Sequence, residues 1–145
     1  MKKKTYHKKG YVRCKYLEDI GVSPEKYGTN FCDKSDRRWK RWKKQRKKYG
    51  FDDRETWCLE YTFYQWLYTR LTMYKKIAGK TVDLEWHKVN YTPEGSDEPI
   101  ELTEKQAIDI IRKEAKRMIL TEDDTERFNP NIMRLFYDML PFLGW

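Results

Sequence analysis

Nine lysine and arginine residues fill the twelve positions from Arg37 to Lys48, in the string RRWKRWKKQRKK. Cationic side chains at this density repel one another, and an array of phosphate groups would relieve that repulsion while releasing counterions. The run therefore indicates a surface that binds a phosphate-bearing ligand. The alternative is a solvated helix face with no ligand, which is a common role for charged segments.

Two tryptophans interrupt this basic run. Trp39 and Trp42 share one face of a helix with Tyr49, because the three residues recur at helical spacing. Their rings either stack on the bases of a nucleic acid or anchor the helix to the core. The shared face favours the anchor.

A second candidate site combines two arginines with aromatic side chains. Arg54 and Arg70 lie in a segment where aromatic residues recur every three or four positions. If either guanidinium points inward among Trp57, Tyr61 and Trp66, the result is a pocket suited to a nucleotide. The alternative is that both arginines lie at helix ends and pair with acids.

The ligand-binding residues that we expect come from these two features. They are Arg37, Arg38, Lys40, Arg41, Trp42, Lys44, Arg54, Trp57, Tyr61, Trp66 and Arg70. Trp42 and Trp66 are the candidates for stacking on a base. The chain has no glycine-rich phosphate loop, no G-x-S-x-G elbow and no HExxH pair, so we expect neither an enzyme nor a cofactor.

A metal site is the main catalytic alternative. Asp83, Glu85 and His87 alternate with apolar residues in the segment 81–89, and on one face of a strand they could hold a divalent cation in a small hydrolase. Any half-exposed strand shows the same alternation, and no second cluster of ligands accompanies it. We therefore expect no metal.

The elements that would position these residues follow from periodicity and end signals. We expect a basic helix over 35–49 capped by Asp33 or Ser35, a central helix over 51–78, an amphipathic helix over 103–120 and a last helix over 130–140. Gly50 and Gly79 would end the first two helices. We expect a strand over 81–89, paired with the N-terminal strap, and a surface loop over 91–101.

This pattern predicts a mainly α protein with a minor β component (α+β). We expect four helices in a single domain around the central aromatic helix, with a short strand or hairpin. Residues 1–16 would form a basic arm or strap, and residues 17–145 one compact domain. A chain of 145 residues is long enough to build a core without disulfides or metal.

Charge is unevenly distributed along the chain. Residues 1–50 hold 18 Lys plus Arg against 5 Asp plus Glu, a net of +13, whereas residues 51–145 hold 13 against 18, a net of −5. A basic half on a mildly acidic body indicates an anionic partner, either a nucleotide or a nucleic acid. The aromatic central helix could also form the interface of a homo-oligomer.

Cysteine usage and hydropathy indicate the compartment. The three cysteines are odd in number and widely spaced, which is typical of reduced thiols in a cytoplasm. The basic start is followed by no apolar run, and no stretch is apolar enough to span a membrane. We therefore expect a cytoplasmic protein with no membrane partner.

The string FDDRETWCLEYTF from Phe51 to Phe63 resembles the central helix of small bacteriophage proteins that carry F-D-D-x-E-T-W-x-L-[DE]-Y-T-F. The ending LPFLGW is similar in style to their tails, which finish on a proline and tryptophans. The resemblance covers the central and last helices, and it brings no catalytic residues. It implies a phage accessory protein of the bacterial host cytoplasm, which blocks a host defence protein, sequesters a signalling nucleotide or coats nucleic acid.

Overall fold

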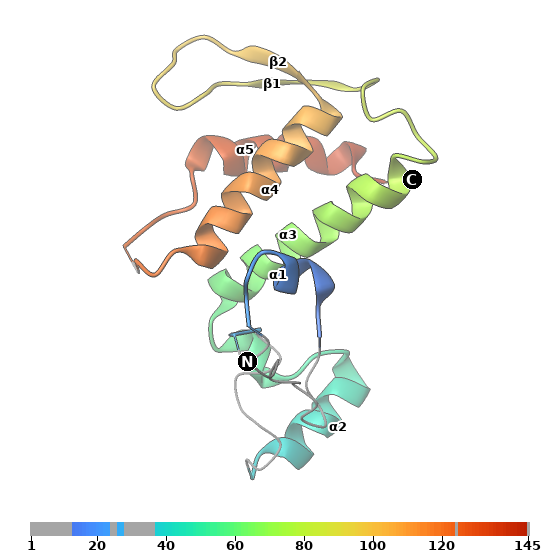
Figure 1. Ribbon diagram of the computed structural model, residues 1–145, viewed down its shortest axis with the longest axis vertical. Coiled ribbons are helices and arrows are strands. Elements are labelled where there is room, and N and C mark those ends of the chain that lie inside the picture. Colours follow the sequence, from blue (N-terminus) through green and yellow to red (C-terminus); the bar gives the residue numbers. More distant parts are fainter. Residues whose placement is uncertain (1–12, 24–25, 28–36, 124, 145) are drawn as a thin grey trace, which may run out of the picture. The chain divides into compact units, whose positions relative to one another are not determined.

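The computed structural model describes residues 13–23, 26–27, 37–123 and 125–144. These residues form five α-helices and one two-stranded antiparallel sheet (Figure 1), which confirms a mainly α fold with a minor β component. The helices are α1 (Lys15–Asp19), α2 (Trp39–Tyr49), α3 (Leu59–Ala78), α4 (Glu104–Leu120) and α5 (Pro130–Met139). The strands are β1 (Lys88–Tyr91) and β2 (Ile100–Thr103), and two 3-10 helices are η3 (Asp53–Thr56) and η4 (Leu140–Phe142).

The chain divides into two compact units, with the boundary inside α3. The first unit is Met1–Gln65 and the second is Trp66–Trp145. The single domain expected over residues 17–145 stays a prediction. So does the basic arm over 1–16, most of which lies outside the described residues.

In the first unit, α2 begins later than the sequence predicts. Arg38 occupies the N-cap position without a side-chain hydrogen bond, and Arg37 precedes it in a turn. The expected caps Asp33 and Ser35 lie outside the described residues. The end is as predicted, because Gly50 adopts a left-handed conformation with φ of 84° and its N–H donates to the Arg46 carbonyl.

The central helix is shorter than predicted. Asp52 caps the 3-10 helix η3 instead, by accepting a hydrogen bond from the Arg54 N–H at 3.1 Å. This side-chain cap favours a tight local turn over a regular helix, so α3 starts only at Leu59. At the other end, a Cβ on Gly79 would lie 2.7 Å from the Lys75 carbonyl oxygen, so close approach requires the glycine there.

The strand predicted over 81–89 is wrong in extent, and the N-terminal strap expected to pair with it lies mostly outside the described residues. The structure has turns over most of 81–87, and β1 begins at Lys88. Its partner is β2 in antiparallel register, with Lys88 opposite Thr103 and Tyr91 opposite Ile100. The expected surface loop therefore closes a hairpin. The alternation of residues within 81–89 could not identify β2 as the partner strand, because β2 is only four residues long.

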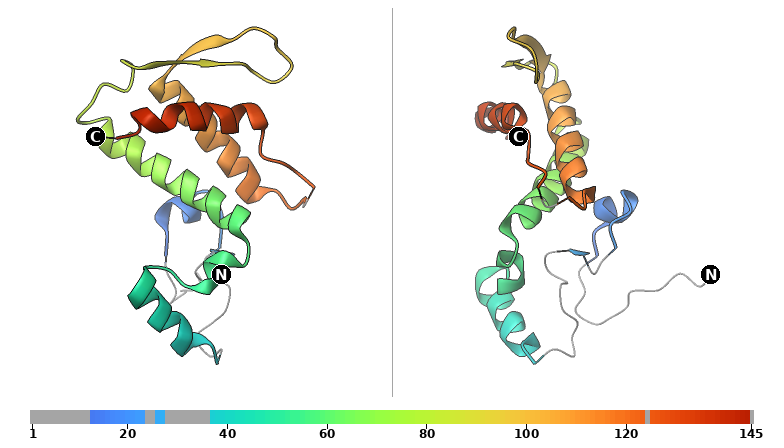
Figure 2. Two further views of the ribbon diagram at one scale, coloured as in Figure 1. Left: turned by 180° about the vertical axis from the view of Figure 1, so that it is seen from behind. Right: turned by 90° about the vertical axis from the view of Figure 1, so that its left-hand side faces the viewer.

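The second unit packs α4 and α5 against each other and against the hairpin (Figures 1 and 2). α4 starts with the predicted capping box: Gln106 N donates to Thr103 Oγ1 at 3.2 Å and Thr103 N donates to Gln106 Oε1 at 2.9 Å. The buried side chains include Ala107, Ile108, Ile111, Ala115, Ile132, Leu135 and Met139. Lys75 and Asp109, with Nζ and Oδ1 at 2.7 Å, tie the last turns of α3 to α4.

Candidate functional site

Trp42 is the buried centre of the first unit, and none of its surface is exposed. The edge of its ring meets Trp57 at 5.8 Å between centroids, with planes at 72°. The guanidinium carbon of Arg54 lies 4.6 Å from its centroid and that of Arg38 lies 5.1 Å away. Trp42 therefore anchors α2 to the core and has no free face for a base, which corrects its expected stacking role.

Arg54 forms a buried ion pair with Asp52. Its Nε and Nη2 donate to the two oxygens of Asp52 at 2.9 and 2.8 Å, and both side chains are nearly inaccessible. Burial alone would raise the pKa of Asp52, but the hydrogen bonds and charge of Arg54, with help from Arg46, outweigh it and lower the pKa below its usual value. The alternative that the sequence left open, an arginine paired with an acid, is what the structure shows for Arg54.

Two further arginines connect α2 to the segment that follows it. Arg46 donates from Nε to Asp52 Oδ2 at 3.3 Å and from Nη2 to Glu55 Oε2 at 3.0 Å. Arg41 Nη2 donates to Asp53 Oδ2 at 2.8 Å. These bonds hold α2 against η3, because Asp53 and Glu55 lie in η3 and Asp52 is its N-cap.

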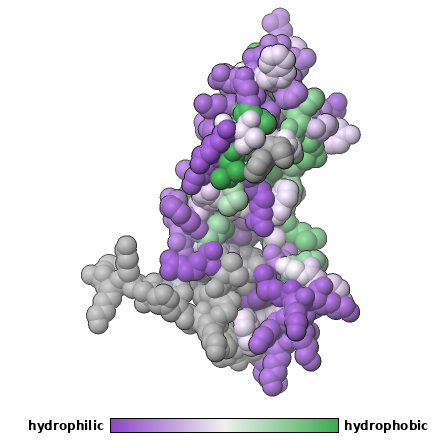
Figure 3. Space-filling view, turned by 90° about the vertical axis from the view of Figure 1, so that its right-hand side faces the viewer, coloured by the Kyte–Doolittle hydropathy of each residue, from purple (hydrophilic) through white to green (hydrophobic). Residues whose placement is uncertain are grey.

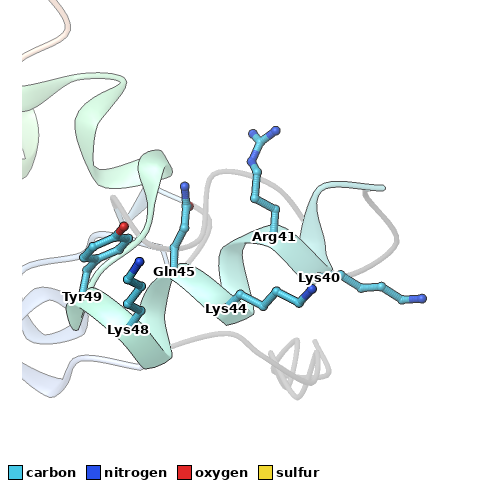
Figure 4. Close-up of a pocket in the computed structure, with 6 residues that line it drawn as sticks. All are labelled: Lys40, Arg41, Lys44, Gln45, Lys48 and Tyr49. Atoms are coloured by element: carbon cyan, nitrogen blue, oxygen red, sulfur yellow. The ribbon is translucent and has the colours of Figure 1, made fainter.

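The lysines of α2 have a different environment. Lys40, Lys44 and Lys48 recur every four residues and line one hollow of about 350 Å³, together with Arg41, Gln45 and Tyr49 (Figure 4). We call Lys40, Lys44 and Lys48 the lysine face. None of the three forms an ion pair with any residue in the described ranges, although Lys48 Nζ lies 5.1 Å from the centroid of the Tyr49 ring.

Lysines also occupy the neighbouring side of α2. Lys43 and Lys47 line a second hollow of about 290 Å³ with Trp39, Arg46 and Arg54. Like the lysine face, these two lysines make no ion pair within the part of the chain that the structure describes. The surface over α2 is accordingly strongly hydrophilic, as the lower part of Figure 3 shows. The positive charge of the first unit is therefore concentrated on lysines that no described acid neutralises.

The remaining expected residues lie in several places. Arg38 stacks on both Trp42 and Trp57, with its guanidinium carbon 5.0 Å from the Trp57 centroid. Trp57 is 45% exposed, and Tyr61 is half-buried, with burial raising the pKa of its phenol. The first unit thus brings Arg38, Trp42, Arg54 and Trp57 together around one core.

Trp66 and Arg70 belong to the second unit. The Arg70 guanidinium carbon lies 6.0 Å from the Trp66 centroid, and its Nη1 donates to Thr69 Oγ1 at 3.0 Å. Both side chains are exposed. Arg54 and Arg70 therefore belong to separate units.

Sequence reasoning missed several residues of the α2 surface. Lys48 shares the period of Lys40 and Lys44, so helical spacing could have found it. Tyr49 was assigned to the core seam, yet it is 58% exposed on the rim of the larger hollow.

The expected trio of possible metal ligands does not form a site. Asp83 and Glu85 lie in a turn, where Asp83 Oδ1 accepts from the Glu85 N–H at 2.9 Å. The His87 ring stacks on Phe142 at 4.9 Å between centroids. Within the described ranges, no group of three His, Cys, Asp or Glu side chains is arranged to hold a metal ion.

Comparison with known proteins supplies no further guide to function. No protein-family model matches the chain, and neither a curated protein nor a solved structure matches it. In the described part of the chain, every helix is too short or too polar to cross a membrane. The geometry of the two units is therefore the basis for the proposals below.

Proposed function

We propose that the first unit binds a phosphate-bearing polyanion, the backbone of DNA or RNA, through the lysine face of α2. The observation that supports this is that the arginines and the lysines of the first unit differ in their partners. The arginines Arg41, Arg46 and Arg54 pair with acids, whereas the lysine face forms no ion pair with a described residue. The arginines thus hold α2 in place, and the lysines that no described acid neutralises bind the phosphates.

The spacing of the lysine face suits an extended ligand. Four residues of α-helix rise about 6 Å, so Lys40 and Lys48 are separated by about 12 Å along the axis. Over that length one strand of a duplex presents about three or four phosphates, at one per 3.4 Å of helix axis. Three cations in a row along an open hollow therefore match a run of phosphates better than one compact anion.

Salt dependence tests this proposal directly. Fluorescence anisotropy with a labelled oligonucleotide should give an affinity that falls steeply with salt, and each phosphate contact to duplex DNA contributes about 0.9 to the slope of log K against log salt. Replacing Lys40, Lys44 and Lys48 together by Gln should reduce the slope by about 2 to 3. The control variant changes Lys76, Lys113 and Lys116 to Gln, which are exposed lysines of the second unit.

Two results would overturn the proposal. One is an affinity at low salt that does not respond to the lysine-face substitutions. The other is an equal loss in the control variant, which would show that net charge alone drives binding. If neither single-stranded nor duplex nucleic acid binds at low salt, a host defence protein that binds this chain directly becomes the better hypothesis.

A free nucleotide is the second candidate, and the exposed ring of Tyr49 favours it. Tyr49 lies on the same hollow as Lys44 and Lys48, so one base could stack while its phosphates meet the lysines. Such a ligand should survive a salt wash, raise the absorbance at 260 nm and be released by heat. Replacing Tyr49 by Ala should abolish its retention while leaving the salt slope for oligonucleotides unchanged.

We further propose that this binding serves a bacteriophage accessory protein in the host cytoplasm, where it counters a defence or signalling pathway. The resemblance of Phe51–Phe63 to small phage proteins supports this role. The test is phage plating on a bacterial strain that carries a defence system. Expression of this chain should restore plaques, whereas the lysine-face variant should not. Equal plaque numbers with and without the wild-type chain would contradict an anti-defence role.

A further inference from the structure

The second unit contains a hollow of about 300 Å³ with a composition opposite to that of the lysine face. Its walls include Tyr74, Asp83, Trp86, His87, Glu104 and Phe142. Neither lysine nor arginine lines it among the described residues, although the chain has 31 of them. Four flat rings and two carboxylates therefore surround one small cavity.

Two of the aromatic residues that line the hollow pack on each other. His87 and Phe142, distant in sequence, stack with centroids 4.9 Å apart and planes at 29°. Trp86 is 76% exposed at the edge of the hollow. Leaving so large an apolar side chain in water costs free energy, and a ligand that covers it would recover that cost.

Glu104 supplies a buried acceptor at the same place. The residue is only 2% exposed, and Tyr74 donates its hydroxyl to Oε1 at 3.1 Å. Burial, together with this hydrogen bond, raises the pKa of Tyr74 to about 12, so the phenol remains a donor at neutral pH. No described residue donates to Oε2, so among the described residues only one carboxylate oxygen of Glu104 has a partner.

The position of Glu104 at the start of α4 accounts for part of this arrangement. A helix N-terminus favours a carboxylate through its dipole. The dipole does not account for the four rings or for the cavity. A divalent metal ion is a poor match, because no group of three ligands is arranged for one in the described ranges.

We propose that this hollow binds a small organic cation, an alkylated ammonium that retains one N–H. The N–H would donate to Glu104 Oε2, and the methyl groups would contact the faces of Trp86 and Phe142. A cavity of about 300 Å³ lies at the small end of ligand pockets, which suits a head group of this size. This site is independent of the polyanion binding proposed for the first unit.

Isothermal titration calorimetry with three probes tests the site. Protonated N,N-dimethylbutylamine has an N–H and a charge, butyltrimethylammonium has only the charge, and 3,3-dimethylbutan-1-ol is neutral. We expect affinity to fall in that order, with at least about a tenfold loss on removing the charge-assisted hydrogen bond. Equal affinity for the neutral alcohol, or no heat from any probe at millimolar concentration, overturns the proposal.

Two variants locate the binding. Glu104→Gln should remove the preference for the amine that carries an N–H, and Trp86→Ala should weaken both cations several-fold. Because Trp86 is exposed, its variant should fold normally even if Glu104→Gln does not. Tyr137→Ala, on a residue 68% exposed outside the hollow, is the control and should bind as the wild type does. Unchanged binding by folded Trp86→Ala would place the cation elsewhere.

Discussion

At the scale of single residues, the first unit contains a buried ion pair between Arg54 and Asp52. The sequence presents Arg54 as a possible ligand-binding cation, yet its guanidinium makes two hydrogen bonds to one buried carboxylate and lies over Trp42. A bidentate pair in this environment uses the planar fork of arginine, which lysine cannot reproduce. Arg54 is thus part of the scaffold that presents the lysines.

Replacing Arg54 by Met should destabilise the first unit strongly. The substitution leaves the carboxylate of Asp52 buried with a poorer set of partners, and breaking a buried pair in this way typically costs about 3–5 kcal/mol. Urea unfolding followed by tryptophan fluorescence measures the loss. Arg134→Met is the control, because the pair of Arg134 and Asp138 is largely exposed and should contribute at most about 1 kcal/mol. Equal losses in the two variants would contradict the structural role of Arg54.

The same pair predicts a response to acid. The folded-state pKa of Asp52 is lowered, so its contribution to stability is present above its ordinary value of 3.8 and is lost as the pH falls through the lower folded pKa. Urea midpoints measured from pH 7 down to pH 2 should therefore drop steeply below about pH 4. Asp52→Asn should flatten that drop. An Asn variant with the wild-type pH profile would assign the acid sensitivity to other carboxylates.

At the scale of elements, the helix ends separate into those set by local sequence and those set by neighbours. The capping box of α4 and the left-handed Gly50 of α2 are both local, and both are where the sequence predicts them. Gly79 also stands at a helix end, but its φ is not positive. The carbonyl oxygen of Lys75 is what requires a glycine there.

Gly79→Ala should therefore destabilise the second unit by about 1–3 kcal/mol, the usual cost of forcing an extra methyl group into packed structure. The backbone must shift, because the new Cβ would meet the Lys75 carbonyl oxygen at 2.7 Å. Gly144→Ala is the matched control, since a Cβ at Gly144 meets no atom within 4 Å. Circular dichroism in a urea titration compares the two. A Gly79 variant as stable as the Gly144 variant would refute the steric argument.

At the scale of the whole molecule, the two compact units differ in the chemistry of their surfaces. The first presents lysines over α2 that form no ion pair with a described residue, and the second presents carboxylates and rings around its hollow. This follows the division of the sequence into a half of net +13 and a remainder of net −5, from 18 basic against 5 acidic residues and 13 against 18. The chain therefore has one surface that is positively charged and one hollow that is lined by carboxylates.

Binding to the two units should be separable. The variant with Gln at Lys40, Lys44 and Lys48 should lose oligonucleotide affinity and keep its affinity for dimethylbutylammonium, whereas Trp86→Ala should do the reverse. Anisotropy and calorimetry on the same preparations measure both. If either variant loses both ligands, the sites are coupled or one of the two assignments is wrong.

The sequence by itself determined the features that depend on near neighbours in the chain. Helical spacing, caps and glycines predicted α2, α4, α5 and most of α3, and the density of lysine and arginine predicted the basic surface of α2. The fold class follows from these elements. Local patterns succeed here because a helix makes its hydrogen bonds within four residues.

Only the tertiary structure decided which cation pairs with which acid and where the rings meet. Lys75 in α3 pairs with Asp109 in α4, 34 residues along the chain, and His87 stacks on a phenylalanine more than fifty residues away. The hollow around Glu104 brings together the end of α3, the turn before β1, the start of α4 and the C-terminal η4. Contacts between such distant segments depend on packing, and a periodicity read from one segment carries no information about them.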